Sequence, residues 1–270
     1  MSAHANTGTV LDRILDARRA DVEHRKKVVP ETVLKYGVKA ASPPRGFSTA
    51  LSREGLNIIA ELKPASPSRG VIRDPFDAVA LARSLEAAGA AALSVLTEPE
   101  FFNGSLKNMR DARKEIALPV LRKDFIFDPW QVWEARANDA DSFLLIVAAL
   151  DDVLLRELID LGREIGMEAL VEVHTVEELD RALGAGARIL GVNNRDLKTL
   201  GVRVETSFEL VDRIPDECVA VSESGLRTHD DLLRLRMAGF DAFLVGEQLM
   251  LASDPAAALS GLLSVAPKIT

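Results

Sequence analysis

The chain has 270 residues, of which 47% are hydrophobic and 27% are charged, the proportions of a folded globular protein. Its formal net charge of −8 argues against nucleic acid as a partner, because a nucleic-acid-binding face is rich in Lys and Arg. The longest apolar run, FLLIVAAL at 143–150, is too short to cross a bilayer, so we expect no membrane span.

Two features indicate the cellular compartment. The single cysteine, Cys218, cannot form an internal disulfide, and we expect it to be a small buried residue. The N-terminal residues are too polar for a secretory signal peptide. Both features favour the cytoplasm.

Eight short apolar runs recur along the chain, each nearly continuous, as in a parallel strand that helices cover on both faces. They lie at 57–62, 91–96, 120–126, 142–148, 168–174, 188–194, 218–224 and 241–247. Helix signals separate them. We predict helix starts at Asp74–Pro75, Asp128–Pro129, Thr175/Glu178 and Thr228/Asp231, and helix ends at Gly89, Gly166, Gly184 and Gly239.

This alternation predicts the α/β class and a single (β/α)8 TIM barrel over 57–270. A doubly wound sheet would place a glycine-rich dinucleotide loop after its first strand, and AELKPASPSRG at 60–70 contains none. Residues 1–56 form an N-terminal helical extension of the same domain, with a helix over about 9–27 and a polar connection after it. We expect this extension to cover one mouth of the barrel.

Polar residues stand at the carboxyl ends of most predicted strands, where barrel enzymes have their active sites. They are Glu61, Lys63, Lys123, Glu172, His174, Asn193, Asn194, Arg195, Glu223, Ser224 and Glu247, with Gly225 and Gly246 beside them. Burying several charges is costly unless they are paired or bind a ligand, so together they predict a site. His174 fits better as the residue before the Thr175 helix start. In VLRKDFI at 120–126, alternation turns Lys123 inward, and Arg122 and Asp124 toward the helices.

The loops SESGL at 222–226 and VGEQL at 245–249 each carry a glycine after one of the last two strands. In a barrel this is the usual place for a phosphate, which backbone N–H groups bind. The four histidines, His4, His24, His174 and His229, are scattered and lack the spacing of metal ligands. We therefore predict a phosphate site and no metal site.

Six motifs resemble indole-3-glycerol phosphate synthase of tryptophan biosynthesis: IIAELKPASPSRG, LRKDFI, LVEVH, GVNNRDLKTL, SESGL and LVGEQLM. The resemblance implies ring closure of 1-(2-carboxyphenylamino)-1-deoxyribulose 5-phosphate to indole-3-glycerol phosphate, with loss of carbon dioxide and water. It also implies that this carboxy-lyase needs no cofactor.

The resemblance further implies roles for individual residues. Lys123 would be the general acid that protonates the substrate carbonyl, and Glu172 the acid/base of the dehydration. Lys63 would contact the substrate carboxylate and share in the later proton transfer. Glu61 and Asn193 would orient the two lysines and the substrate hydroxyls.

Substrate contacts are implied in the same way. Arg195 would lie near the anthranilate carboxylate, and Phe125 and Leu144 would hold the aromatic ring. Glu223 would bind substrate, and Ser224 beside it would belong to the catalytic residues.

The phosphate would contact Ser66, Gly225, Gly246 and the backbone of Glu247. Two positions depart from the pattern, since some relatives have Lys in place of Ala65 and many have Ser in place of Glu247. A carboxylate repels a dianion, so we expect the Glu247 side chain to point away from the site.

Other interpretations stay open at this point. A Schiff-base aldolase would use Lys123 or Lys63 as a nucleophile, and a sugar-phosphate isomerase would share the phosphate site. A catalytically dead barrel that serves as a scaffold is disfavoured because every matched charged position is filled. We expect a monomer, and association with other enzymes of the pathway is open.

Overall fold

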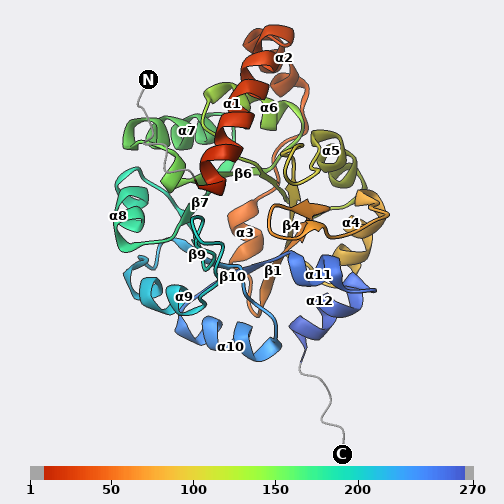
Figure 1. The fold of residues 1–270 in the computed structure, drawn as a ribbon, viewed down its shortest axis with the longest axis vertical. Coiled ribbons are helices and arrows are strands. Elements are labelled where there is room, and N and C mark those ends of the chain that lie inside the picture. Colours follow the sequence, from red (N-terminus) through yellow and green to blue (C-terminus); the bar gives the residue numbers. More distant parts are fainter. Residues whose placement is uncertain (1–8, 265–270) are drawn as a thin grey trace, which may run out of the picture.

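Eight parallel strands close into a barrel in the computed structural model, which describes residues 9–264 (Figure 1). Around the barrel the order is β1-β10-β9-β8-β7-β6-β5-β4, so each strand pairs with its neighbour along the chain and β1 closes against β10. The strands are β1 Asn57–Leu62, β4 Ala92–Leu96, β5 Val120–Lys123, β6 Ser142–Ile146, β7 Glu168–Val173, β8 Ile189–Asn193, β9 Val219–Glu223 and β10 Ala242–Val245. This arrangement confirms the predicted (β/α)8 barrel.

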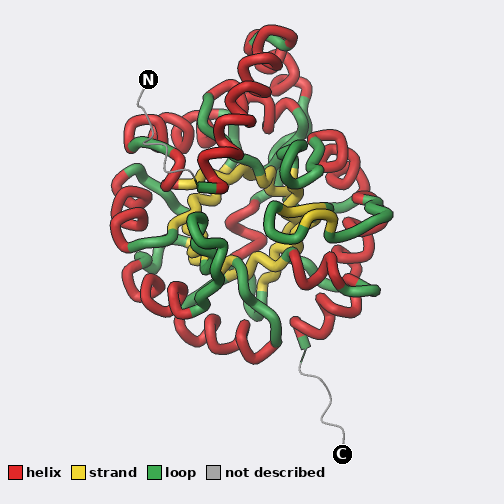
Figure 2. The backbone as a smooth tube through the Cα atoms, viewed as in Figure 1, coloured by secondary structure: helices red, strands yellow, loops and turns green. Residues whose placement is uncertain are grey.

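Helices form an outer ring around the strands (Figure 2). They are α4 Ala78–Ala87, α5 Leu106–Glu115, α6 Pro129–Ala137, α7 Asp152–Glu164, α8 Val176–Gly184, α9 Glu205–Leu210, α10 His229–Ala238, α11 Glu247–Leu251 and α12 Pro255–Leu263, with short 3-10 turns at Val147–Ala149 and Val211–Arg213. Within residues 9–264, no helix is long and apolar enough to span a membrane.

Several predicted boundaries need correction. The start of α4 is not at Asp74 and Pro75, because Asp77 lies directly before the helix and its carboxylate accepts the N–H groups of Val79 and Ala80. The starts at Asp128, Thr175 and Thr228 are confirmed. The left-handed residue after α8 is Gly186, with φ of 89°, since Gly184 is still helical.

Strand β5 ends at Lys123, three residues earlier than predicted. Side chains take over the backbone hydrogen bonds beyond it: Asp124 accepts the N–H of Phe125, and Gln131 of α6 bonds to the backbone of Phe125 and Phe127. The chain can therefore leave the sheet without exposing unpaired buried groups. Glu247 is likewise not in the last strand but begins α11.

The N-terminal extension contains α1 Val10–Val28, α2 Glu31–Ala40 and α3 Phe47–Leu51. The predicted first helix is confirmed, whereas α2 and α3 occupy the stretch expected to be a polar connection. Residues 1–8 of the predicted extension, with His4, lie outside the described residues. Viewed down the barrel, the short helix α3 is seen through the ring of strands (Figures 1 and 2).

The extension contacts both ends of the barrel. At the amino ends of the strands, Phe47 and Leu51 of α3 are fully buried against the barrel interior, and Ser48 N–H donates to Glu168 at the start of β7. At the carboxyl ends, Arg18 of α1 pairs with Asp124 just after β5. The expectation that the extension covers one mouth of the barrel is therefore too simple, because α3 packs at the amino ends of the strands and α1 reaches the carboxyl ends.

Candidate active site

A cavity of about 710 Å³ opens at the carboxyl ends of the strands. Its lining includes all the predicted site residues except Ser66: Glu61, Lys63, Lys123, Phe125, Leu144, Glu172, Asn193, Arg195, Glu223, Ser224, Gly225, Gly246 and Glu247. These residues come from seven of the eight strands or the segments that follow them, and barrel closure brings them to one mouth.

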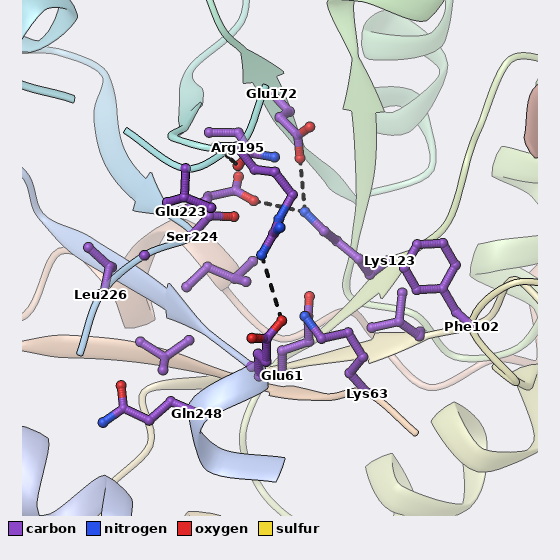
Figure 3. Close-up of a pocket in the computed structure, with 18 of the residues that line it drawn as sticks. Glu61, Lys63, Phe102, Lys123, Glu172, Arg195, Glu223, Ser224, Leu226 and Gln248 are labelled. Atoms are coloured by element: carbon purple, nitrogen blue, oxygen red, sulfur yellow. Dashed lines mark hydrogen bonds and ion pairs between the residues drawn. The ribbon is translucent and has the colours of Figure 1, made fainter. Parts of the chain in front are cut away.

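Lys123 lies between two carboxylates in the wall of this cavity (Figure 3). Its Nζ is 3.0 Å from Oε2 of Glu172 and 2.8 Å from Oε2 of Glu223. All three side chains are largely buried, so water screens these contacts only weakly. An ammonium group has three donors, and two are used here, which leaves one N–H for a bound substrate.

A second lysine–carboxylate pair, Lys63 and Glu61, lies at the end of β1. Nζ of Lys63 is 2.9 Å from Oε1 of Glu61, and the hydroxyl of Ser94 donates to the other oxygen of Glu61. Burial alone would raise the pKa of Glu61, but Lys63 and Lys123 outweigh it and hold that pKa below its usual value. Glu61 therefore stays ionised and fixes the position of the Lys63 ammonium.

Two glycines make room for the buried carboxylates. A Cβ at Gly191 would collide with Oε1 of Glu223, and a Cβ at Gly246 would collide with Oε1 of Glu61. Such contacts are far inside van der Waals distance, so a side chain at either position would displace the carboxylate. The sequence suggested a phosphate contact for Gly246, and the structure adds this packing reason.

The charges of the Lys123 cluster are strongly coupled. Burial lowers the pKa of Lys123, but Glu172, Glu223 and Glu61 raise it more, so it lies above its ordinary value. Burial would also raise the pKa of Glu172, yet Lys123 and His174 lower it to about 2. For Glu223, burial and the neighbouring Glu172 prevail over Lys123 and raise the pKa to about 7. Near neutral pH, Glu172 is therefore ionised, whereas Glu223 readily binds a proton.

The side chain of Glu247 lines the cavity, which differs from the predicted orientation. Its Oε1 is 2.7 Å from Nε of Arg69, and its Oε2 is 3.6 Å from Nη2 of Arg195. The guanidinium groups of Arg69 and Arg195 thus hold the Glu247 carboxylate at the cavity. Arg195 is also held by its own backbone loop, because its Nη1 donates to the carbonyl of Leu200.

One wall of the cavity is aromatic, and the sequence predicted Phe125 in it but not Phe102. The ring of Phe102, in the segment between β4 and α5, lies 5.9 Å from the ring of Phe125. The segment is held by the buried carboxylate of Glu98, which accepts the N–H groups of Glu100, Phe101 and Phe102. The adjacent pair Phe101 and Phe102, in an otherwise polar segment after the predicted strand, was the available signal.

The turn after β9 has a special backbone. Ser224 and Gly225 both have left-handed φ values, 67° and 80°, and Asn194 donates to the carbonyl of Ser224. A left-handed serine is uncommon and is strained by roughly 1–3 kcal/mol, so the surrounding contacts must hold it. Ser66, in contrast, lies in the hairpin of β2 Ala65–Ser66 and β3 Gly70–Val71 and lines a smaller adjoining hollow of about 100 Å³.

Lys63, Phe125 and Glu247 line both hollows, so Ser66 borders the same continuous mouth. Within the part of the chain that the structure describes, no group of three or more His, Cys, Asp or Glu is arranged to hold a metal ion.

Comparisons with known proteins agree with this geometry. The profile of the family "Indole-3-glycerol phosphate synthase" matches residues 11–262. The indole-3-glycerol phosphate synthase of Mycobacteroides abscessus is 48% identical over 259 residues, which cover 96% of this chain and 95% of that protein. That of Koribacter versatilis is also 48% identical, with 94% and 99% covered.

Among solved structures, a 3-hexulose-6-phosphate synthase superposes with a TM-score of 0.62 at 14% identity, covering 77% of this chain and 98% of that one. At that identity the likeness supports the barrel fold alone. The matched profile and the near-full-length relatives go further: the chain belongs to the indole-3-glycerol phosphate synthase family.

Proposed function

We propose that this protein closes the indole ring of indole-3-glycerol phosphate in tryptophan biosynthesis, with Lys123 as the general acid. The observation that carries the residue assignment is the Lys123 ammonium, paired with Glu172 and Glu223 at the cavity wall. The substrate is 1-(2-carboxyphenylamino)-1-deoxyribulose 5-phosphate, and carbon dioxide and water leave.

In the first step the ring carbon that bears the carboxylate attacks the substrate carbonyl carbon. The carbonyl π electrons move to oxygen, and Lys123 donates a proton there, so no free alkoxide accumulates. The flanking carboxylates keep the lysine protonated until that moment, because they stabilise its charged form. Loss of carbon dioxide then returns the bonding electrons to the ring.

Dehydration completes the reaction. The new hydroxyl must leave as water, and a proton must leave the neighbouring carbon or nitrogen. Glu172 is ionised and reaches the same space as Lys123, so we assign it the proton removal. Lys63, which Glu61 positions, shares the proton delivery, and Asn193 at the end of β8 completes this wall.

The two anionic ends of the substrate need different partners. Arg195 suits the anthranilate carboxylate, since a guanidinium group binds a planar carboxylate well. Phe125 and Leu144 would hold the ring between them. Ser66, Gly225, Gly246 and the backbone N–H of Glu247 would bind the phosphate, with Ser224 and Glu223 closing that side.

Lys123 is poorly suited to the alternative aldolase chemistry. A Schiff-base lysine must lose its proton to become a nucleophile, whereas the neighbouring carboxylates raise the pKa of Lys123. Borohydride treatment with the substrate would trap an adduct on Lys123 if that chemistry operated.

The direct test is the Lys123→Ala variant. We expect turnover, followed by indole fluorescence, to fall by at least about 100-fold, because the proton donor is lost. Circular dichroism should show an intact fold. The matched control is Lys107→Ala on the exposed face of α5, which should behave as the wild type. Near-normal turnover of Lys123→Ala would overturn the role given to this lysine.

The setting of the enzyme is part of the same proposal. A phosphorylated small molecule is the partner, and we propose a monomer in the cytoplasm. The buried single cysteine, Cys218, and the net charge of −8 support this setting. Sedimentation of the purified chain would test the monomer.

A further inference from the structure

His174 lies behind the cavity, between two carboxylates. Its Nδ1 is 3.1 Å from Oε2 of Glu178 in the first turn of α8, and its Nε2 is 3.5 Å from Oε1 of Glu172 at the end of β7. Glu178 also accepts the backbone N–H of His174 at 2.7 Å, so two contacts fix the ring. His174 directly precedes the Thr175 helix start, as predicted, but its ring also reaches the cavity wall.

The Nε2 atom of His174 is buried and has no hydrogen-bond partner among the described residues. Glu172 offers Oε1 just beyond bonding distance, while its Oε2 already contacts Lys123. A small rotation of the carboxylate would let it accept from both groups at once. A buried polar atom without a partner is costly, so this contact is the expected way to satisfy it.

Because both ring nitrogens face carboxylate oxygens, the doubly protonated imidazolium suits this place. A neutral ring has one N–H and could serve only one of the two acids. The charged groups around the ring are mostly acidic: Glu172 on β7, Glu178 on α8, Glu223 on β9 and Asp196 after β8, with Lys123 of β5 beyond Glu172. Burial alone lowers the pKa of His174, but Glu178 and Glu172 raise it above its usual value.

We propose that His174 is a positioning residue that holds the Glu172 carboxylate through its Nε2–H, while Glu178 orients the ring. This inference rests on the function proposed above for Glu172. When Lys123 gives its proton to the substrate, Glu172 loses its cationic partner, and the cationic His174 keeps the carboxylate ionised and in place. His174 touches no substrate and acts through Glu172 alone.

A paired substitution separates this role from simple capping of α8. In Gln the amide nitrogen stands near the position of the histidine Nε2, so His174→Gln keeps a donor toward Glu172. In Asn it stands near Nδ1, so His174→Asn keeps only the bond to Glu178. We expect kcat of His174→Asn to fall about 10-fold or more with little change in KM, and His174→Gln to retain more activity. If His174 only caps α8, the order of the two variants will be reversed or both will match the wild type.

Nuclear magnetic resonance of the ring nitrogens provides a readout that does not need the reaction. We expect a protonated His174 ring above pH 6.5 in the wild type, with its pKa lowered in both Glu172→Gln and Glu178→Gln. A His174 pKa that responds to Glu178→Gln but not to Glu172→Gln would overturn the inference. Failure of the wild type to convert the substrate would instead overturn the proposed function, and the titration would still report on the Glu172 contact.

Discussion

At the scale of single residues, Glu223 is an acid whose pKa its surroundings raise well above the ordinary value. The carboxylate of Glu223 fits in the barrel because Gly191 has no side chain. Oε1 of Glu223 has no hydrogen-bond partner within the described residues. Glu172 competes with it for Lys123, and two acids that share one cation do not both ionise easily. Glu223 therefore holds a proton that the unfolded chain would release.

This raised pKa predicts a pH-dependent stability. The folded pKa is about 7 against an ordinary value of 4.5, so the contribution of Glu223 is complete below pH 4.5 and is lost as pH rises through about 7. Glu223→Gln removes this dependence. Between about pH 5 and pH 8, we expect the free energy of unfolding of the variant to gain on the wild type by up to about 1.4 kcal/mol per pH unit. Urea unfolding at both pH values measures it, with exposed Glu217→Gln as the control. A constant difference would contradict the protonated Glu223.

At the scale of elements, helix α1 is tied to the end of the strand that carries Lys123, the proposed general acid. Arg18 donates from Nε and Nη2 to the two oxygens of Asp124, at 2.9 Å and 2.8 Å, and all of these groups are buried. Asp124 also accepts from Thr97 and Arg122. Burial raises the pKa of Asp124, but Arg18 and Arg122 outweigh it and lower the pKa to about 2. The extension thus fixes the residue next to Lys123.

Removing the α1 partner should therefore affect both stability and catalysis. In Arg18→Ala, Asp124 keeps Arg122 but loses its bidentate partner, and we expect unfolding free energy to fall by about 3 kcal/mol. Turnover should fall as well, because Lys123 adjoins Asp124. Arg19→Ala is the control, since Arg19 forms an exposed pair with Asp16 and should cost less than about 1 kcal/mol. Equal losses in urea unfolding for the two variants would argue against the coupling.

At the scale of the whole molecule, the two ends of the barrel have different tasks. The carboxyl ends hold the cavity and its charges. The amino ends are closed by α3, whose Phe47 and Leu51 pack on Ile59 and Leu121 inside the barrel. Apolar packing at this end stabilises the ring of strands without contributing to the chemistry.

A substitution at the closed end should separate stability from activity. We expect Phe47→Ala to lower the free energy of unfolding by about 3–5 kcal/mol, because it leaves a cavity in the barrel interior. Measured well below its melting temperature, kcat should stay within about twofold of the wild type. Val33→Ala on the exposed surface of α2 is the control for a lost apolar group. A large loss of kcat in the folded Phe47→Ala protein would show that the two ends are coupled.

The sequence by itself determined the alternation of strands and helices and the polar residues at the strand ends. These are local properties, since hydrophobic runs, caps and side-chain alternation act within a few residues. The start of α4 at Asp77 was missed because two turn signals lie close together there, and the sequence does not say which of them begins the helix. The helices α2 and α3 were missed because a short amphipathic stretch is stable as a helix only when it packs against the rest of the protein.

Only the tertiary structure decided which charges meet. Lys123 is 49 residues from Glu172 and 100 residues from Glu223, and closure of the barrel alone brings the three together. The tertiary structure likewise decides the partners of Glu247, which pairs at the cavity with Arg69 and Arg195 from loops far away in the sequence. Strand patterns place a residue at a mouth of the barrel, but burial and the neighbours it finds there set its partner and its pKa.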